Sequence, residues 1–134
     1  LQGLMKRLLE LEAAAGGVLD HDFIAAHTEG FAALAAELAA RPWDALCADS
    51  GLTREEFDTA ARVYAAAPTV IVAYGMGVTQ HRHGTTAVHQ LANLLLLRGQ
   101  LGRPGAGICP VRGHSNVQGD RTVGINERPP AAFL

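Results

Sequence analysis

Chemically capable side chains gather first in the stretch GMGVTQHRHG, residues 75–84, which directly follows the apolar run TVIVAY. Its glycines let a backbone approach a ligand closely, and the side-chain amide of Gln80 both donates and accepts hydrogen bonds. A helix that begins just after such a loop presents unpaired N–H groups and a partial positive charge. The stretch therefore suits an anion such as a phosphate, although a tight turn that needs glycine for its geometry has the same composition.

A second polar stretch, RGHSNVQGDR, is held between glycines and contains Arg112, His114, Ser115, Asn116, Gln118, Asp120 and Arg121. Arginine binds a planar carboxylate through two parallel hydrogen bonds, and histidine can transfer a proton near neutral pH. These residue types suit a small carboxylate or oxyanion substrate. The alternative is a solvated polar loop whose arginines pair with local acids.

Metal ligation is a further alternative for the histidines of the first stretch. His81 and His83, together with His89, could bind zinc, but His89 lies a full turn inside the expected helix and no fourth ligand is evident. The two cysteines, Cys47 and Cys109, are far apart and outside any CxxC spacing. This usage favours neither a disulfide framework nor a cysteine metal site, and it leads us to expect a reducing, cytoplasmic location.

The elements around the first stretch predict the fold class. TVIVAY is apolar and β-branched without alternation, which is typical of a strand buried on both faces in a parallel sheet. The glycine loop 75–84 follows, and then a helix with Thr85 as its N-cap and Gly99 just beyond its end. We therefore expect an α/β fold, part of a doubly wound parallel-sheet, Rossmann-like cofactor-binding domain, followed by a glycine-rich loop segment that leads into the next domain. Within that loop segment, ICPV could form one short strand.

Three helices are expected between the opening stretch LQGLMKRLLELE, which has a helical pattern of its own, and the strand. DHDFIAAHTEG indicates a short helix with Asp20 or Asp22 as its cap and Gly30 as its stop. The next is expected at roughly residues 30–40, where Phe31, Leu34, Ala35 and Leu38 show the i, i+3, i+4, i+7 spacing of an amphipathic helix. The third begins with Thr53 and Glu56 at capping-box spacing.

The two ends of the sequence are apolar in a way that indicates a fragment. LQGLMKRLLELE opens in helical phase but without an N-cap, and its apolar stripe consists of Leu1, Leu4, Met5 and Leu8. ERPPAAFL ends on Phe133 and Leu134. Because these side chains would have few partners within the fragment, we expect it to be marginally stable on its own.

Composition excludes several classes of function. The 11 basic and 13 acidic residues produce no basic field, so we expect no nucleic-acid partner. The longest strongly apolar stretch, LANLLLLRG, is too short to cross a bilayer, and no signal peptide opens the chain. A chain of 134 residues with 49% apolar content can bury one modest core.

The sequence YGMGVTQHRHGTTAVHQLANLLLLRGQLGRPGAGICPVRGHSNVQG resembles the interior of the large catalytic subunit of molybdopterin oxidoreductases, in the formate dehydrogenase-like branch of the dimethyl sulfoxide reductase superfamily. The resemblance continues upstream through LTREEFDTAARVYA and DHDFIAAHTEGF. It implies an internal fragment of a longer chain. Residues 1–112 would be the C-terminal part of an α/β molybdopterin-cofactor-binding domain, and residues 113–134 would begin a second α/β domain or an interdomain loop.

The resemblance also implies a cofactor. Members of this family carry molybdenum or tungsten on bis-molybdopterin guanine dinucleotide and usually hold an N-terminal 4Fe-4S cluster, with the metal and cluster ligands upstream of this segment. The family's Met-Gly-x-x-Gln segment contacts the dinucleotide and corresponds here to Met76 and Gln80, with Gly75 and Gly77 shaping the loop. Cofactor binding is thus assigned to these four residues, and no metal ligand is expected in the segment.

The second stretch corresponds to the formate dehydrogenase motif Arg-Gly-Gln-Asn-Asn-Val-Gln-Gly, in which the arginine orients the formate carboxylate. Arg112 occupies that place, whereas His114 and Ser115 stand where those enzymes have glutamine and asparagine. The resemblance therefore implies catalytic roles for Arg112, which would position an anionic group, and for His114, which would relay a proton. Formate is a candidate substrate.

Taken with the rest of its own chain and an electron-transfer partner, the segment is expected to serve an enzyme that carries out two-electron redox chemistry on a small substrate. The isolated fragment is expected to be inactive, because the metal ligand and half of the cofactor cleft lie outside it. The alternative is a non-catalytic, truncated α/β module that binds a nucleotide or a partner.

Overall fold

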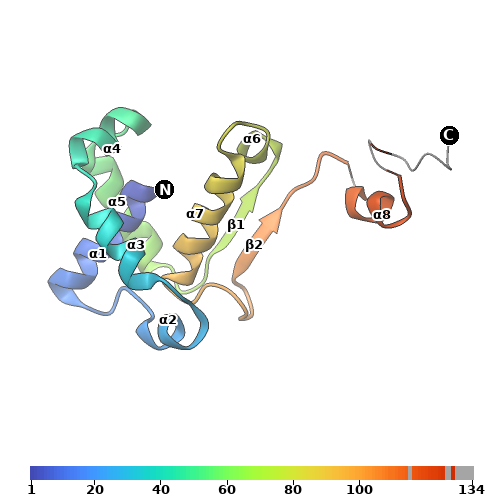
Figure 1. Ribbon diagram of the computed structural model, residues 1–134. Helices are drawn as coiled ribbons and strands as arrows, with labels where there is room; N and C mark the ends of the chain where they lie inside the picture. The colour runs from blue at the N-terminus through green and yellow to red at the C-terminus, as the bar shows by residue number, and fades with distance from the viewer. Residues whose placement is uncertain (115, 126–127, 129–134) are drawn as a thin grey trace.

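The computed structural model describes residues 1–114, 116–125 and 128. The helices and strands of these residues are α1 (Gln2–Ala15), α2 (His21–His27), α3 (Phe31–Ala40), α4 (Trp43–Ser50), α5 (Arg54–Ala66), β1 (Ile71–Tyr74), α6 (Met76–Thr79), α7 (Gly84–Leu96), β2 (Gly107–Pro110) and α8 (Val117–Thr122). Helices α1–α5 pack together, α7 lies between them and the strands, and α8 lies beyond the strands (Figure 1). The segment is a mixed α/β structure, as expected, and is mostly helical.

Local sequence signals set the starts of two helices as predicted. The Oδ1 atom of Asp20 accepts the backbone N–H of Phe23 at 3.0 Å and so caps α2. Thr53 and Glu56 form a reciprocal capping box at the start of α5, with N–H···O distances of 3.2 and 2.8 Å. Each bond satisfies an N–H group that has no partner within its helix.

Two predicted helix ends are wrong. Gly30 does not stop α2; with a φ of 76° it leads the chain into α3, because the left-handed conformation turns the backbone from one helix into the next. Thr85 is not the cap of α7, since His83 holds that position and Gly84 is already helical. The cause is close packing: a Cβ atom on Gly84 would lie 2.2 Å from the carbonyl oxygen of Thr79, so α6 and α7 meet where only glycine fits.

The hydrophobic core lies between α1, α3, α5 and α7, and its fully buried side chains include Met5, Leu8, Leu38, Ala61 and Leu95. The expectation that Met5 and Leu8 lack partners is wrong, because α3 and α5 cover this face of α1. Leu1 is 43% exposed, in line with the expectation. Phe133 and Leu134 lie outside the described residues.

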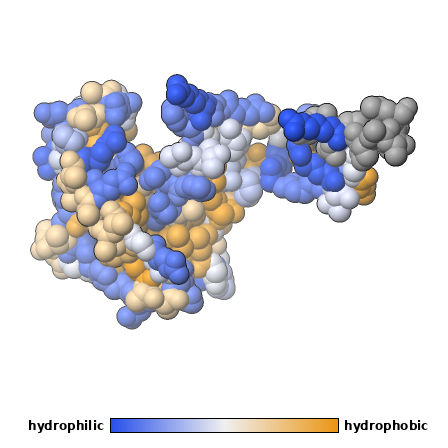
Figure 2. Space-filling model, in the orientation of Figure 1, coloured by the Kyte–Doolittle hydropathy of each residue, from blue (hydrophilic) through white to orange (hydrophobic). Residues whose placement is uncertain are grey.

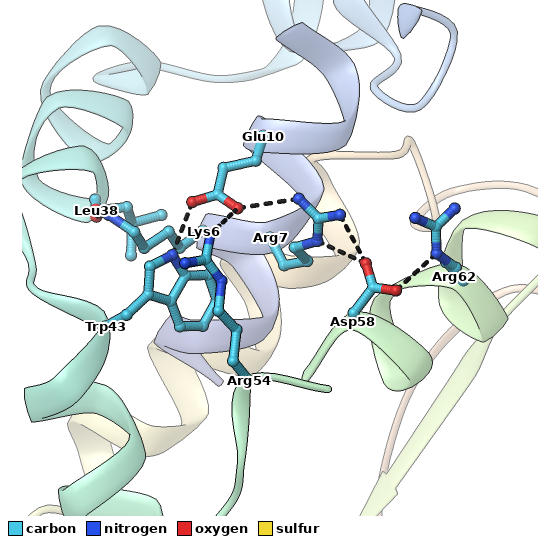
Figure 3. Close-up of polar contacts among 8 residues, drawn as sticks. All are labelled: Lys6, Arg7, Glu10, Leu38, Trp43, Arg54, Asp58 and Arg62. Atoms are coloured by element: carbon cyan, nitrogen blue, oxygen red, sulfur yellow. Dashed lines mark hydrogen bonds and ion pairs between the residues drawn. The ribbon is translucent and has the colours of Figure 1, made fainter. Parts of the chain in front are cut away.

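A polar network joins α1 to α3 and α4 (Figure 3). Lys6 is only 8% exposed, and its Nζ donates to the carbonyl oxygens of Leu38 at 3.1 Å and Ala39 at 2.8 Å. These carbonyls belong to the last turn of α3, where a positive charge complements the helix dipole. The indole Nε1–H of Trp43 donates to Glu10 at 2.8 Å.

Arginine side chains extend this network to α5 (Figure 3). Arg7 of α1 contacts Oδ1 of Asp58 through Nε and Nη2, both at 2.7 Å, and Arg62 donates to the other carboxylate oxygen at 2.7 Å. The hydrogen bonds from Arg62 and Arg7 lower the pKa of Asp58 below its ordinary value. The guanidinium of Arg54 lies 5.0 Å from the centre of the Trp43 ring. Every helix of this network is therefore tied to a neighbour by a charged side chain.

Strands β1 and β2 form a parallel pair whose register runs from Ile71 opposite Gly107 to Tyr74 opposite Pro110. The short strand expected in ICPV is thus confirmed. The expected burial of β1 on both faces is wrong for the described structure, because Ile71 is 62% exposed and exposure alternates along the strand. One face of the sheet is covered and the other is open. Among the helices of the described ranges, none has the length and apolar character needed to cross a membrane.

Candidate functional site

The parallel strands bring the two glycine-rich stretches together. Because Tyr74 lies opposite Pro110, the chain leaves both strands at the same edge of the sheet, which is where α/β folds place their ligands. The N–H of Val111 donates to the carbonyl oxygen of Tyr74 at 2.7 Å and extends the pairing beyond the strands. The segments that begin at Gly75 and Arg112 therefore start side by side.

A cavity of about 280 Å³ lies between these two segments, and we call it the loop cavity. It is lined by Tyr74, Gly75, Met76, Thr79 and Gln80 from the first segment and by Pro110, Val111, Arg112, Gly113, His114 and Val117 from the second. Of the six residues predicted for the site, all but Gly77 line it. The structure therefore gathers the residues expected to bind cofactor and those expected to act on substrate around one space.

The first segment is not the open loop that the sequence predicts. Residues Met76–Thr79 form the short helix α6, in which the N–H of Gln80 donates to the carbonyl oxygen of Met76 at 2.8 Å. Since the two residues are one turn apart, their side chains emerge on the same side, and both reach the loop cavity. Gly77 lies on another side of the α6 turn, which explains why it does not line the loop cavity.

The polar side chains of the loop cavity remain available for a ligand. Gln80, Arg112 and His114 are exposed, and within the described residues none of the three has a side-chain hydrogen bond or ion pair. This disagrees with the alternative in which Arg112 pairs with a local acid. Hydrophilic atoms also gather over the junction of α6 and α7, where residues 80–83 lie on the surface (Figure 2).

Among Gly75, Gly77 and Gly113, only Gly113 lies where a Cβ atom would displace a neighbouring side chain. A Cβ atom on Gly113 would lie 2.2 Å from Sδ of Met76, whereas one on Gly75 would make an ordinary contact of 3.7 Å with the carbonyl oxygen of Val111. A Cβ atom on Gly77 would meet no described atom within 4 Å, and neither Gly75 nor Gly77 has a positive φ. Packing and backbone conformation among the described residues therefore account for Gly113 but not for Gly75 or Gly77.

Several residues of the loop cavity were not predicted. Thr79, Pro110 and Val111 line it because each lies within two positions of a predicted residue, near the end of a strand or helix. The sequence signal available for the last two was their place directly before Arg112. The N-terminus of α7, which we expected to suit a phosphate, contributes no residue to the lining.

No metal centre is found in the described ranges. No three histidine, cysteine or acidic side chains there are grouped so that they could hold an ion. The histidines considered for zinc, His81, His83 and His89, are all exposed, and the backbone N–H of His83 donates to Nδ1 of His81 at 3.1 Å. Both cysteines are free thiols.

A larger cavity of about 460 Å³ lies between the α1–α2 turn and the loop after α7. Most of the polar side chains that line it already have protein partners. Arg98 donates to the carbonyl oxygens of Val18 at 2.9 Å and of Tyr64 at 2.6 Å, and the side chain of Gln100 accepts the N–H of Val70 at 2.9 Å. Burial raises the pKa of Tyr64 to about 12, which keeps its phenol protonated as a donor to Leu94. The hydrogen bonds in this cavity therefore connect neighbouring parts of the fold, and the loop cavity is the candidate site.

The chain is similar in sequence to segments of known oxidoreductases. The chain is 41% identical, over 98% of its length and 17% of the relative's, to an uncharacterized oxidoreductase of Mycobacterium tuberculosis (strain ATCC 25618 / H37Rv). It is 39% identical to formate dehydrogenase H of Escherichia coli (strain K12), over 78% of this chain and 15% of that protein. It is 51% identical over its whole length to Protein YdeP of the same organism, of which it covers 18%. No family model matches the sequence.

The chain therefore matches a segment of formate dehydrogenase-like molybdopterin oxidoreductases, as its motifs predict. It spans only 15–18% of the length of the curated relatives it matches.

Proposed function

We propose that this chain is part of a molybdopterin-dependent, formate dehydrogenase-like oxidoreductase that carries out two-electron redox chemistry on a small anionic substrate. One observation carries the proposal: Met76 and Gln80 share a cavity with Arg112 and His114, although the two pairs are far apart in the sequence. Two of the relatives named above, an uncharacterized oxidoreductase and a formate dehydrogenase, support the same class of reaction.

The residues at the loop cavity fit a molybdopterin guanine dinucleotide that carries molybdenum or tungsten. Glycine at 75 and 77 has no packing role among the described residues, and its remaining physical role is to let a ligand approach the backbone. The exposed amide of Gln80 offers a donor to a phosphate oxygen or a base edge. Bound there, the cofactor would supply the two-electron chemistry of its metal.

Arg112 and His114 would act on the substrate. The Arg112 guanidinium has no partner in the described chain, so its planar pair of N–H groups is free to hold a carboxylate such as formate. His114, two residues further along, would hold or accept a proton at an imidazole nitrogen. Both residues line the loop cavity, so a substrate held by Arg112 would lie close to His114.

We further propose that residues 1–112 complete a doubly wound, Rossmann-like cofactor domain and that residues 113–134 begin the next domain or an interdomain loop. The open face of the sheet supports this arrangement, since Ile71, Ala73 and Cys109 are exposed on one side of the paired strands. Other parts of the longer protein would cover that face. A 4Fe-4S cluster and the docking site of an electron-transfer partner would also lie outside this segment, and the free cysteines favour a cytoplasmic location.

The proposal is tested by the composition of the full-length protein that carries this segment. The protein is purified from cells that make the cofactor, and its metal and guanine nucleotide contents are measured after acid release. We expect molybdenum or tungsten together with guanine nucleotide in fixed ratio to protein. A folded protein that contains neither would overturn the proposal and would favour the non-catalytic α/β binding module.

A further inference from the structure

A close side-chain contact joins the two segments of the loop cavity. Sδ of Met76 lies 2.2 Å, and its methyl carbon Cε 3.4 Å, from the point where a Cβ atom of residue 113 would stand. The thioether therefore rests against the bare Cα of Gly113. This residue lies between Arg112 and His114, so the contact reaches the backbone that carries both side chains.

The contact complements the sheet hydrogen bond. The N–H of Val111 donates to the carbonyl oxygen of Tyr74 at 2.7 Å and holds the start of the second segment. Past that point, Arg112 and His114 have no side-chain hydrogen bond to the described part of the chain, and the Met76 contact gives the segment a second point of attachment. Two attachments a short distance apart define the direction of a backbone, whereas one does not.

We propose that Met76 is a positioning residue that acts through Gly113 to set the place of Arg112 and His114 relative to the first segment. The inference rests on the proposed function, because it concerns how that site is held in shape. The contact also depends on glycine at position 113. Any side chain at that position must displace the thioether, and Met76 itself lines the loop cavity.

The geometry makes this role separable from fold stability. The atom that a Gly113→Ala methyl group would meet is near the end of a flexible side chain, and Met76 is 41% exposed. The thioether can therefore turn away at low cost to folding. Displacing the thioether changes the wall of the loop cavity and frees the second segment. We therefore expect weaker ligand binding with an unchanged unfolding midpoint.

The test is a double-mutant cycle in the full-length protein with Gly113→Ala, Met76→Ala and the combination. Methionine methyl groups carry a carbon-13 label, and the Met76 resonance is assigned by its loss in Met76→Leu. Each variant is titrated with formate, and binding is followed by the shift of the His114 ring resonance. The surface change Val123→Ala, at a residue that is 73% exposed, serves as the control.

We expect the unchanged protein to show magnetisation transfer between the Met76 methyl group and the Gly113 α-protons. Gly113→Ala should shift the Met76 resonance and weaken formate binding about tenfold. The displaced thioether no longer holds the segment that carries Arg112, and the strength of a positioned contact depends steeply on its geometry. The combined variant should recover most of that loss, since the new methyl group fills part of the space that the thioether leaves. The unfolding midpoint and the control should not change.

Each failure points to a different cause. A Met76 resonance that does not move in Gly113→Ala would show that the contact is not made, and would overturn the inference. So would equal formate affinity in all four proteins, while the proposed function would stand if Arg112→Lys still weakened binding. An unchanged protein that binds no formate would overturn the anion-binding role of Arg112, and the positioning role of Met76 with it.

Discussion

The helical part and the loop cavity use charged and polar residues in opposite ways. In the helical part, Lys6 is buried and donates to two backbone carbonyls, and Arg7 contacts an acid on another helix. At the loop cavity, Arg112 and His114 are exposed and have no such partner in the described chain. A cation whose donors are already bonded to protein can stabilise a fold, but only one with free donors can bind a ligand.

The comparison also separates two kinds of glycine. Gly84 is required by the backbone of α6, because its Cβ atom would overlap the carbonyl oxygen of Thr79, which cannot turn away. Gly113 is required only by the end of a methionine side chain, which can. Substitution should therefore cost stability at the first position and ligand binding at the second. Four variants test whether stability and function divide between the two regions in this way.

The largest effect is expected in the core. Leu8→Ala removes a side chain that is 0% exposed and leaves a cavity between α1 and its neighbours. We expect the free energy of unfolding to fall by about 2–5 kcal/mol, measured by urea denaturation. Leu52→Ala, at a residue that is 43% exposed, is the matched control and should cost no more than about 0.5 kcal/mol. Equal losses in the two variants would contradict the assignment of the core to α1.

The next effect concerns turnover rather than stability. Arg112→Lys keeps the charge but loses the planar pair of donors, so the turnover of formate, or of the natural substrate, should fall roughly 100-fold, about 2.7 kcal/mol. The unfolding midpoint and the metal content should stay unchanged.

The matched control for Arg112→Lys is Arg41→Lys. Arg41 forms an exposed ion pair with Asp49 at 3.3 Å, and such pairs contribute little. Full activity in Arg112→Lys would remove this residue from the substrate site and return its segment to a structural role.

A smaller effect is expected on cofactor retention. Gln80→Ala removes one polar contact from the loop cavity while leaving the core intact, so the cofactor should bind more weakly by about 1.5–3 kcal/mol, the value of one hydrogen bond to a charged group. Guanine nucleotide content after dialysis measures the loss. Gln2→Ala, at the start of α1 and outside the loop cavity, is the control. Equal nucleotide content in the two variants would mean that the α6 segment is only a turn.

The smallest effect is a pH dependence at the α1–α2 turn. The backbone N–H of Leu19, then the side chain of His21 and the N–H of Val18, lower the pKa of Glu12 below its ordinary value of 4.5. The carboxylate therefore stabilises the fold above about pH 4.5, and this contribution is lost as the pH falls through the lower pKa of the folded state.

Glu12→Gln tests this pH dependence. Because the site is near the surface, the difference from the unchanged protein at neutral pH should be about 0.2–1 kcal/mol, and it should shrink towards acid pH. Urea denaturation at a series of pH values measures it. A difference that grows below pH 4.5 would have the wrong sign.

The sequence by itself determined several local elements and predicted the residues of the candidate site. Thr53 and Glu56 specify the start of α5 because their hydrogen bonds span only three positions, and Asp20 caps α2 for the same reason. The residues Met76, Gln80, Arg112 and His114 were found from motif and residue type alone. The parallel pairing of β1 with the ICPV segment was also within reach, because the order of strand, helix and strand favours it.

Tertiary structure alone decided how these pieces meet. The overlap that requires Gly84 and the contact between Met76 and Gly113 join atoms whose positions depend on the path of the chain between them. The open face of β1 likewise depends on which elements lie beside it, because an apolar run is compatible with burial but does not supply the covering surface. Local hydrogen bonds are encoded within a few residues, whereas a packing contact exists only once distant segments share a place in space.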